Sequence, residues 1–252
     1  MAQTERKVAL VTGGSAGIGK AIAESFAARG DTVVISDVDQ ERGEKLADQL
    51  RGGGGDAYFV KTDVSELDAV KHLFAEIKDR YGRLDYAVNN AGIEGEQNET
   101  ADCTYENFDR TIKVNLYGVF YGMKHELDIM REQGSGVIVN ISSIAGEVGF
   151  MNLPAYCASK GGVIQLTKTA ALEYAARNIR VNAICPAVIM TEMVERITNH
   201  DPAVQAEFAK LQPMERTGTP QEIADSVMWL CSDKSSFVTG QAINIDGGYL
   251  AR

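Results

Sequence analysis

Three side chains in the second half of the chain could together move a proton. Tyr156 and Lys160 are four residues apart at the start of an apolar helical pattern, so both are expected on one helix face, a turn apart. A free tyrosine titrates at about 10, and a neighbouring ammonium lowers that value because it favours the phenolate. Ser143 follows a strand-like run at 136–141, where its hydroxyl could hold a substrate oxygen. The three residues predict acid–base chemistry, although an exposed pair on a surface helix would have the same spacing.

A glycine-rich loop near the beginning of the chain predicts a binding site for phosphate groups. The segment TGGSAGIG at 12–19 separates a strand-like run at 7–11 from a helical pattern that ends near Gly30. Glycines allow a sharp turn and let backbone amides approach a pyrophosphate, which the first turn of the following helix stabilises. The order of strand, loop and helix is that of a dinucleotide-binding unit.

Asp37 stands at the end of the next predicted strand, at 32–36. It lies about twenty residues beyond the glycine loop, where a carboxylate that binds the ribose hydroxyls of NAD is expected. Such a carboxylate repels the 2′-phosphate of NADP through like charge. The glycine loop contains no basic residue, and the first one after Asp37 is Arg42. The sequence therefore predicts NAD over NADP, unless Asp37 only caps the helix that follows.

Strands and helices alternate along the whole chain, with no linker between them. Apolar runs typical of buried strands occur at 7–11, 32–36, 57–60, 84–88, 136–141, 180–185 and 241–245. Helical patterns lie between them, at 40–50, 66–81, 104–131, 156–177 and from Pro220 onward. This alternation predicts an α/β protein, a Rossmann-like doubly wound parallel sheet of about seven strands in a single domain spanning 1–252. The irregular segment at about 187–214 is expected to form a substrate lid, with ordinary surface packing as the alternative.

Polar residues recur where the chain should pass the carboxyl edge of the sheet. Asp63 and Val64 follow the third strand, where an adenine could be held, and NNAG at 89–92 follows the fourth. Asn115 lies in the middle of the helix predicted at 104–131. Asparagine is unfavourable there because its amide competes for backbone hydrogen bonds. A role in the site would explain Asn115, and so would an amide whose bonds are satisfied elsewhere.

Composition and charge disfavour several classes of partner. The formal net charge of −10 argues against nucleic acid and anionic membranes, which require clustered Lys and Arg. The four cysteines are scattered without a CxxC pair, so we expect no metal site and no disulfide framework. No apolar stretch approaches the length of a membrane span, and no leader precedes the first strand. We expect a cytoplasmic protein.

Taken in order, these motifs resemble the short-chain dehydrogenase/reductase family over essentially the whole chain. Besides the residues above, the matching pieces are YCASK at 156–160, Pro186 with Thr191, and IDGG at 245–248. The resemblance implies an NAD-dependent oxidoreductase with Ser143, Tyr156 and Lys160 as a triad and Asn115 supporting a water relay. It also implies that NAD is held by Gly13, Ser15, Gly17, Ile18, Gly19, Asp37, Asp63, Val64, Asn90, Gly92, Tyr156, Lys160, Pro186, Ile189 and Thr191. The family usually has glycine where this chain has Ala187, so the backbone beside Ile189 and Thr191 is expected to be held differently.

The predicted reaction is hydride transfer between NAD(H) and a secondary alcohol or ketone, with Tyr156 as the general acid or base. Apolar residues after the serine favour a hydrophobic or cyclic substrate, namely Ile144, Val148, Met151 and Leu153. Three carboxylates near the predicted pocket mouth are either solvated or select a polar or cationic group, namely Glu94, Glu96 and Glu147. The acidic balance and Asp37 disfavour an acyl-carrier-protein reductase.

Other functions fit the same fold. The main alternative is a non-catalytic binding protein that senses a nucleotide, and a further one is dehalogenation without a nucleotide. The complete triad and the open glycine loop argue against these two. By resemblance, and because two long helices offer extended apolar faces, we expect a homo-oligomer, most simply a tetramer.

Overall fold

A seven-stranded parallel sheet forms the centre of the computed structural model, which describes residues 6–251. The strand order is β3-β2-β1-β4-β5-β6-β7, so the direction of winding reverses between β1 and β4. The strands are β1 (Val8–Thr12), β2 (Thr32–Asp37), β3 (Asp56–Lys61), β4 (Tyr86–Asn89), β5 (Gly136–Ile141), β6 (Ile179–Pro186) and β7 (Ala242–Ile245). The predicted Rossmann-like doubly wound sheet in a single domain is confirmed, and the ends of the predicted span 1–252 lie outside the described residues.

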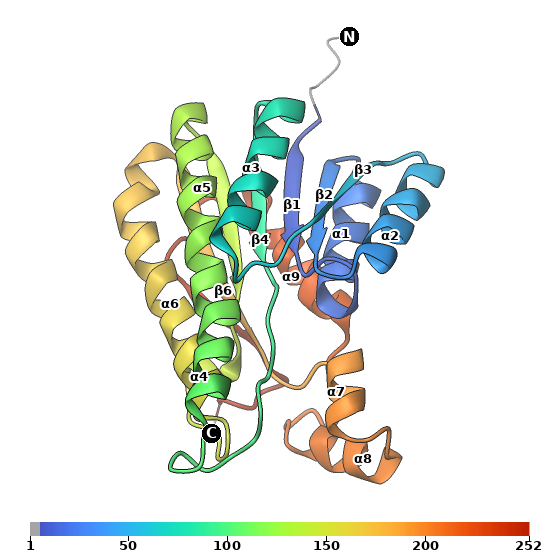
Figure 1. The fold of residues 1–252 in the computed structure, drawn as a ribbon, viewed down its shortest axis with the longest axis vertical. Coiled ribbons are helices and arrows are strands. Elements are labelled where there is room, and N and C mark those ends of the chain that lie inside the picture. The colour runs from blue at the N-terminus through green and yellow to red at the C-terminus, as the bar shows by residue number, and fades with distance from the viewer. Residues whose placement is uncertain (1–5, 252) are drawn as a thin grey trace.

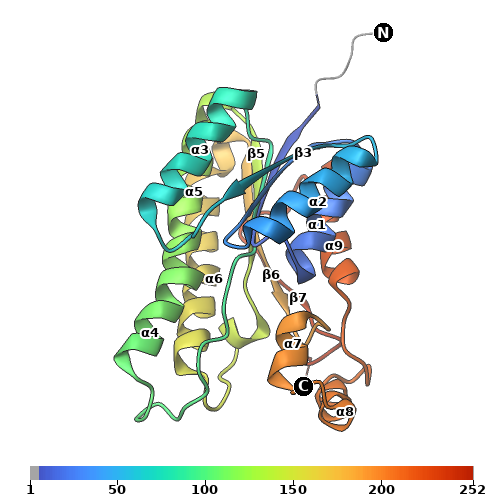
Figure 2. The same cartoon turned by 45° about the vertical axis from the view of Figure 1, so that its right-hand side comes forward.

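Helices cover both faces of the sheet, as Figure 2 shows. One layer contains α1 (Gly17–Arg29), α2 (Gln40–Gly52) and α9 (Pro220–Leu230). The other contains α3 (Leu67–Tyr81), α5 (Gly118–Gln133) and α6 (Pro154–Tyr174). Because both faces are covered, the central strands are almost continuously apolar, and all five residues of β1 are buried. This burial is why the strands were recognisable as short apolar runs.

Two short helices lie beyond the carboxyl edge of the sheet (Figure 1). They are α7 (Glu192–Ile197) and α8 (Pro202–Lys210), and both belong to the irregular segment at 187–214. Among the described residues, no helix is long and apolar enough to cross a membrane.

The helix predicted at 104–131 is interrupted by a π-helical turn. The structure has α4 (Tyr105–Ile112), a π-helical segment at Lys113–Tyr117, and then α5. The predicted long helix is thus confirmed, and the π turn within it was not foreseen, because a π turn adds one residue without disturbing the apolar periodicity on either side. Asn115 lies inside this wide turn.

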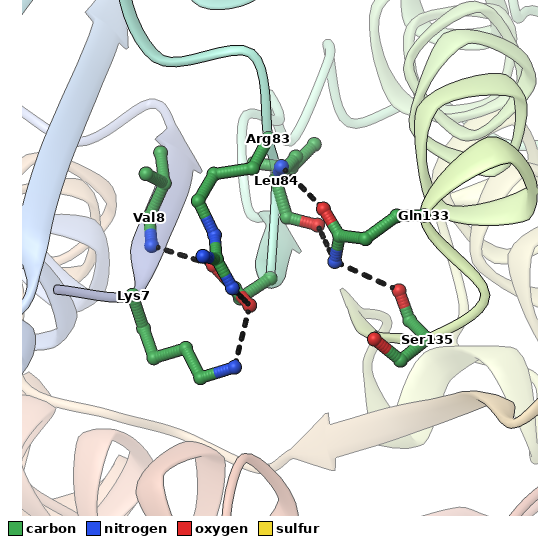
Figure 3. Close-up of polar contacts among 7 residues, drawn as sticks. Lys7, Val8, Arg83, Leu84, Gln133 and Ser135 are labelled. Atoms are coloured by element: carbon green, nitrogen blue, oxygen red, sulfur yellow. Dashed lines mark hydrogen bonds and ion pairs between the residues drawn. The ribbon is translucent and has the colours of Figure 1, made fainter. Parts of the chain in front are cut away.

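The amino edge of the sheet is closed by a cluster of polar contacts around Asp85 (Figure 3). Its carboxylate accepts bonds from Lys7 Nζ, the Val8 amide and the Arg83 side chain. Burial by itself raises the pKa of Asp85, but Arg83, Val8 and Lys7 outweigh that effect and hold it below its ordinary value. The side chain of Gln133 bonds both backbone groups of Leu84. These contacts join β1, the turn before β4 and the end of α5 at the edge opposite the candidate site.

A polar network lies in the core between α5, α6 and the sheet. Asn89 Nδ2 donates to Glu126 Oε2 at 3.1 Å and to Asn140 Oδ1 at 2.9 Å, and Asn140 Nδ2 donates to Thr167 Oγ1 at 2.8 Å. Glu126 is fully buried, and no described residue bonds its Oε1. Burial raises the pKa of Glu126 to about 8. This carboxyl is therefore protonated at neutral pH in the folded chain.

The protonation of Glu126 predicts a pH-dependent stability. The folded chain keeps a proton that the unfolded chain releases above the ordinary pKa of 4.5. Stability is therefore lost as pH rises from 4.5 toward 8, by about 1.4 kcal/mol per pH unit from this group. The substitution Glu126→Gln removes the proton but keeps a neutral side chain of the same shape. In urea unfolding at about pH 5 and 7.5, we expect the variant to gain stability relative to wild type at the higher pH.

The matched control is Glu132→Gln, which removes an exposed carboxylate from the same helix. Its stability difference from wild type should be nearly the same at both pH values. If the Glu126→Gln difference also failed to change with pH, Glu126 would not be protonated in the folded chain.

Candidate active site

Ser143, Tyr156 and Lys160 meet at the carboxyl edge of the sheet. Ser143 comes two residues after the end of β5, and the first half of α6 carries Tyr156 and Lys160. Lys160 is buried, and its Nζ donates to the carbonyl oxygen of Ile141 at 2.8 Å and lies 5.7 Å from the centroid of the Tyr156 ring. The Ser143 side chain is close enough to the phenol to lower its pKa. The structure thus brings together the three residues that the sequence singled out.

The electrostatics of the pair differ from the sequence-based expectation. Burial raises the pKa of Tyr156 to about 12, the Ser143 side chain acts against this, and the charge of Glu94 adds to it. Burial also lowers the pKa of Lys160 to about 8. The expected lowering of the tyrosine pKa by the ammonium is absent in this structure, because the loss of water around the phenol is the larger effect. At neutral pH the chain therefore holds Tyr156 as a phenol.

Asn115 is completely buried beside the same residues. Its Oδ1 accepts from the Ile93 amide at 2.8 Å, and its Nδ2 donates to the Ile93 carbonyl at 2.8 Å and to Ser159 Oγ at 3.1 Å. A Cβ on Gly92 would lie 3.3 Å from Asn115 Oδ1 and 3.4 Å from Lys160 Nζ. The hydrogen bonds of the amide are therefore satisfied within the fold, next to the catalytic candidates, and a role of Asn115 in the reaction stays a prediction.

The glycine loop is held against the end of β4 by Asn90. The Asn90 side chain donates to the carbonyls of Thr12 and Gly13, each at 3.0 Å, and its backbone amide donates to Thr12 Oγ1. Gly13 has a φ of +61°, and a Cβ there would lie only 2.8 Å from the Ala91 Cα. In this structure the Asn90 side chain binds the loop itself and thereby fixes its shape.

Asp37 ends β2 beside the glycine loop. Its Oδ2 accepts from the backbone amide and the hydroxyl of Ser15, and its Oδ1 accepts from the Asp39 amide. Asp39, and not Asp37, caps α2, because its side chain accepts from the Arg42 amide. The alternative in which Asp37 serves only as the helix cap is therefore excluded. A carboxylate accepts about four hydrogen bonds, which leaves capacity for ribose hydroxyls.

Asp63 and Val64 lie at the end of β3 in different environments. Asp63 is exposed, and its Oδ1 accepts from the amide and the hydroxyl of Ser65, which closes a local turn. Val64 is buried and faces Gly118, where a Cβ would come within 2.8 Å of its side chain. The Val64 side chain is thus part of the packing between this loop and α5.

The segment after β6 runs past the glycine loop. Pro186 ends β6, and the Ala187 amide donates to the Ile245 carbonyl at 3.2 Å. Ala187 has no positive φ, so the chain accommodates a side chain where the family usually has glycine. Ile189 is buried in the core against Gly218, which leaves its backbone, not its side chain, for other contacts. The Thr191 side chain faces Gly17, with its Cγ2 3.4 Å from the point where a Cβ on Gly17 would lie.

Among the described residues, two ion pairs join the segment 187–214 to the rest of the chain. Arg42 of α2 bonds Glu192 at the start of α7, and Arg196 of α7 lies 3.5 Å from Oε1 of the half-buried Glu94. The other two carboxylates at the predicted pocket mouth are exposed. Glu96 lies 3.8 Å from an Arg110 nitrogen, and Glu147 is on the surface.

Of the four apolar residues expected to line the pocket, Ile144 is buried in the core. Val148 and Met151 are exposed beside the site, and Leu153 is half-buried. A hollow of about 530 Å³ is lined by residues of α4, and one of about 480 Å³ lies at the amino edge near Lys7 and Asp85. Neither includes Ser143 or Tyr156. The candidate site is therefore identified by its chemistry and its place at the carboxyl edge.

Sequence reasoning missed two residues that position the site. Thr12 receives the Asn90 and Ala91 amides on its hydroxyl, and Ser159 links Asn115 to the carbonyl of Tyr156. Ser159 follows Tyr156 by three residues, so its place on the same face of α6 was a usable signal. The pairing of Ser159 with Asn115 had no such signal, because the two residues are 44 positions apart in the sequence.

The residues at this edge fit a nicotinamide dinucleotide. The helix α1 starts after Ala16, which offers no side-chain cap, and its first turn has no acidic residue. Its first amides are thus open to an anion such as a pyrophosphate, whereas α2, α4 and α9 are capped by side chains. Asp37, at the end of β2 and three strands along the sheet from β5, would be the acceptor for a ribose hydroxyl. Ser143, Tyr156 and Lys160 would lie at the nicotinamide end, across the point where the strand order reverses.

The chain is similar to known dehydrogenases and reductases over nearly its whole length. It is 42% identical to a cyclohexanol dehydrogenase of Acinetobacter sp. (strain SE19), covering 98% of this chain and 96% of that protein. The crystal structure of levodione reductase has a TM-score of 0.94 at 40% identity, covering 97% of this chain and 98% of that one. A variant of actinorhodin polyketide ketoreductase solved with NADPH has a TM-score of 0.94 at 34% identity, covering 99% of each chain.

The family model described as Enoyl-(Acyl carrier protein) reductase matches residues 13–250. This match covers the glycine loop, the triad and the closing strand, and it agrees with the parallel sheet and the site described above. The chain belongs to the short-chain dehydrogenase/reductase family, whose members are oxidoreductases that bind a nicotinamide cofactor.

Proposed function

We propose that this protein transfers a hydride between NAD(H) and a secondary alcohol or ketone, preferably a hydrophobic or cyclic one. The observation that carries the proposal is the meeting of Ser143, Tyr156 and Lys160 beside Gly92, at the edge where the glycine loop also ends. A proton-carrying phenol, a hydroxyl and a buried ammonium are what the oxygen of such a substrate requires.

Each side chain has a separate role in this proposal. The nicotinamide, when bound, accepts or supplies the hydride. Tyr156 donates a proton to the ketone oxygen or removes one from the alcohol, and Ser143 holds that oxygen by a hydrogen bond. Lys160, charged below its pKa of about 8, stabilises the phenolate and binds the nicotinamide ribose. Asn115, fixed to Ile93 and Ser159, holds the π turn against Lys160 and supports a water relay.

The remaining cofactor contacts follow the path from the glycine loop to Thr191. Gly13, Gly17, Gly19, Ser15 and Ile18 surround the pyrophosphate. Asp37 takes the adenosine ribose, Asp63 and Val64 lie at the adenine, and Asn90, Gly92, Pro186, Ile189 and Thr191 lie along the nicotinamide half. The segment 187–214 closes over the cofactor as a lid, which the contact of Thr191 with Gly17 supports.

The substrate class is supported by the relatives and by the exposed residues near the site. Cyclohexanol, named for one relative, is a cyclic secondary alcohol. Val148 and Met151 are exposed apolar side chains that follow Ser143 in the chain. Glu94, in the loop after β4, and Arg196, in the proposed lid, neutralise each other's charge in an ion pair. The absence of net charge from this pair suits an uncharged substrate.

NAD is proposed over NADP on the position of Asp37. Its carboxylate is held in place by Ser15 and the Asp39 amide at the end of β2, where a 2′-phosphate would meet its charge. The ketoreductase solved with NADPH shows that this fold also accepts the phosphorylated coenzyme, so the choice rests on these side chains.

We also propose that the protein acts in the cytoplasm on a small molecule and has no nucleic-acid partner. The four cysteines are free thiols, which suits a reducing compartment. The net charge of −10 disfavours binding to phosphate backbones.

The raised pKa of Tyr156 predicts opposite pH profiles for the two reaction directions. Oxidation needs the phenolate, whose fraction grows about tenfold per pH unit below the pKa of about 12. Lys160 keeps most of its charge up to its pKa of about 8. Between about pH 6 and 7, we expect kcat/KM for cyclohexanol oxidation with NAD to rise about tenfold. Cyclohexanone reduction should stay level, because the phenol remains protonated.

NADH absorbance at saturating coenzyme measures both directions. The control is Tyr156→Phe, which should still bind NAD by calorimetry but lose turnover in both directions. Full activity of this variant, or an oxidation rate that does not change with pH, would show that Tyr156 is not the general acid or base. A wild-type protein that binds NAD without any turnover on a panel of alcohols would instead be the nucleotide-sensing alternative.

Coenzyme choice can be tested by removing one charge. The substitution Asp37→Asn keeps hydrogen-bonding capacity toward Ser15 and the ribose but no longer repels a 2′-phosphate. We expect the ratio of kcat/KM for NAD to that for NADP to fall by about tenfold or more. Asp48→Asn is the matched control, because it removes the same charge from an exposed position on α2, where the carboxylate pairs with Arg51. A wild-type preference for NADP, or equal effects of the two variants, would contradict the assignment.

We further propose that the chain assembles with itself, as a tetramer, through the face formed by α4 and the start of α5. Aromatic side chains are exposed there, namely Tyr105, Phe108, Tyr117 and Phe120. Three of them line the hollow of about 530 Å³. Large aromatics of this kind dominate protein interfaces and rarely gather on a monomer surface.

Light scattering at micromolar concentration should give a mass of four chains. Phe120→Glu should reduce that mass, because it places a charge in the middle of the proposed face. Val38→Glu, at an exposed valine before α2, should leave the mass unchanged. A monomer mass for the wild-type protein would contradict the proposal.

A further inference from the structure

An ion pair joins the helix after Asp37 to the proposed lid. Arg42 NH1 donates to Glu192 Oε2 at 2.6 Å, across 150 residues of sequence. Arg42 lies in the first turns of α2, and Glu192 is the first residue of α7. The two side chains are about half exposed, at 52% and 55%. A pair of this kind contributes about 1 kcal/mol or less to stability, so its main effect is on the charged groups next to it.

Arg42 is surrounded by carboxylates next to the proposed ribose site. Its Nε lies 3.4 Å from Asp39 Oδ2, and the other side of its guanidinium bonds Glu192. The Glu192 side chain raises the pKa of Arg42 most, and the charges of Asp39 and Asp37 add to that effect. Arg42 is therefore close enough to Asp37 for the negative charge of Asp37 to raise the pKa of Arg42. It is also the first basic residue after Asp37 in the chain.

Glu192 lies beside the path of the cofactor from the other direction. It follows Thr191, whose side chain faces Gly17 of the glycine loop. The start of α7 is thus held between the phosphate loop and α2. A carboxylate at this point can reach the same guanidinium that a phosphate on the adenosine ribose would otherwise recruit.

We propose that Glu192 determines coenzyme specificity by holding Arg42 in an ion pair and so denying it to a 2′-phosphate. This inference rests on the proposed NAD-dependent function. Discrimination then has two sources: Asp37 repels the phosphate, and Glu192 occupies the guanidinium that would bind it. Guanidinium groups bind phosphate through paired hydrogen bonds, so a free Arg42 would favour NADP. Removing Glu192 frees the NH1 side of the guanidinium for a phosphate, while Asp39 stays 3.4 Å from Nε.

A purely structural latch between α2 and α7 makes a different prediction. If the pair only held the lid closed, losing either partner would weaken both coenzymes alike. If Glu192 acts on specificity, its loss changes only the binding of molecules that carry a 2′-phosphate, and only while Arg42 is present.

The test is calorimetric binding of 2′,5′-ADP and 5′-AMP, two nucleotides that differ by the 2′-phosphate and lack nicotinamide. We expect Glu192→Gln to bind 2′,5′-ADP up to about fivefold more tightly than wild type, because the phosphate no longer competes with an exposed ion pair for Arg42, and to bind 5′-AMP equally well. The double variant with Arg42→Gln should lose that gain. The control Glu195→Gln removes the same charge from the same helix and should have no effect.

The outcomes separate this inference from the function on which it rests. Wild-type protein that binds neither 5′-AMP nor NAD would overturn the proposed function. Wild-type protein that binds both, with an unchanged affinity of Glu192→Gln for 2′,5′-ADP, would overturn only the role of Glu192. A gain that persists without Arg42, or that appears equally in Glu195→Gln, would also overturn it, because it would reflect net charge alone.

Discussion

The parallel pairing of β1 with β4 is the constraint on which the site depends. The register places Val11 opposite Val88, so the glycine loop and the NNAG segment leave the sheet at the same level. Thr12 and Asn90 then bond the two segments to each other, and Gly13 allows the close approach to Ala91. Because the strand order reverses at this pair, the loops diverge to opposite faces and leave room for a ligand between them. The pairing of the strands therefore sets where the cofactor site lies, and the side chains decide which cofactor it accepts.

Burial sets the protonation of the candidate catalytic side chains within that frame. It raises the pKa of Tyr156 from its ordinary 10.0 to about 12 and lowers that of Lys160 from 10.5 to about 8, which moves the two values apart. The buried Asn115 lies next to them, and its side chain makes three hydrogen bonds, to Ile93 and Ser159. The carbonyl of Ile141 orients the ammonium. The site is thus preorganised by the core, not by the surface.

Charges outside the core help to attach the segment 187–214. Apart from Ile189 this segment contributes little to the two core clusters. Its pair with Arg42 is exposed, and in its pair with Glu94 the carboxylate is half-buried. Such pairs are weak and are screened by salt. The segment is also anchored inside the fold, because Thr198 and Gln212 are buried and the Met190 amide donates to the Gly218 carbonyl. Salt therefore weakens the contacts of its surface charges and leaves the buried contacts unchanged.

The sequence by itself determined the elements and the local motifs, because these depend on patterns within a few residues. Apolar runs marked the strands, TGGSAGIG marked the turn into α1, and the spacing of Tyr156 and Lys160 placed both on one helix face. The position of Asp37 at the end of β2 also followed from local pattern. Only the tertiary structure decided the direction of the Tyr156 pKa, the π turn around Asn115 and the burial of Ile144. It alone placed Arg42 against Glu192, because burial and charge pairing depend on which distant segments pack together, and no periodicity in the chain records that.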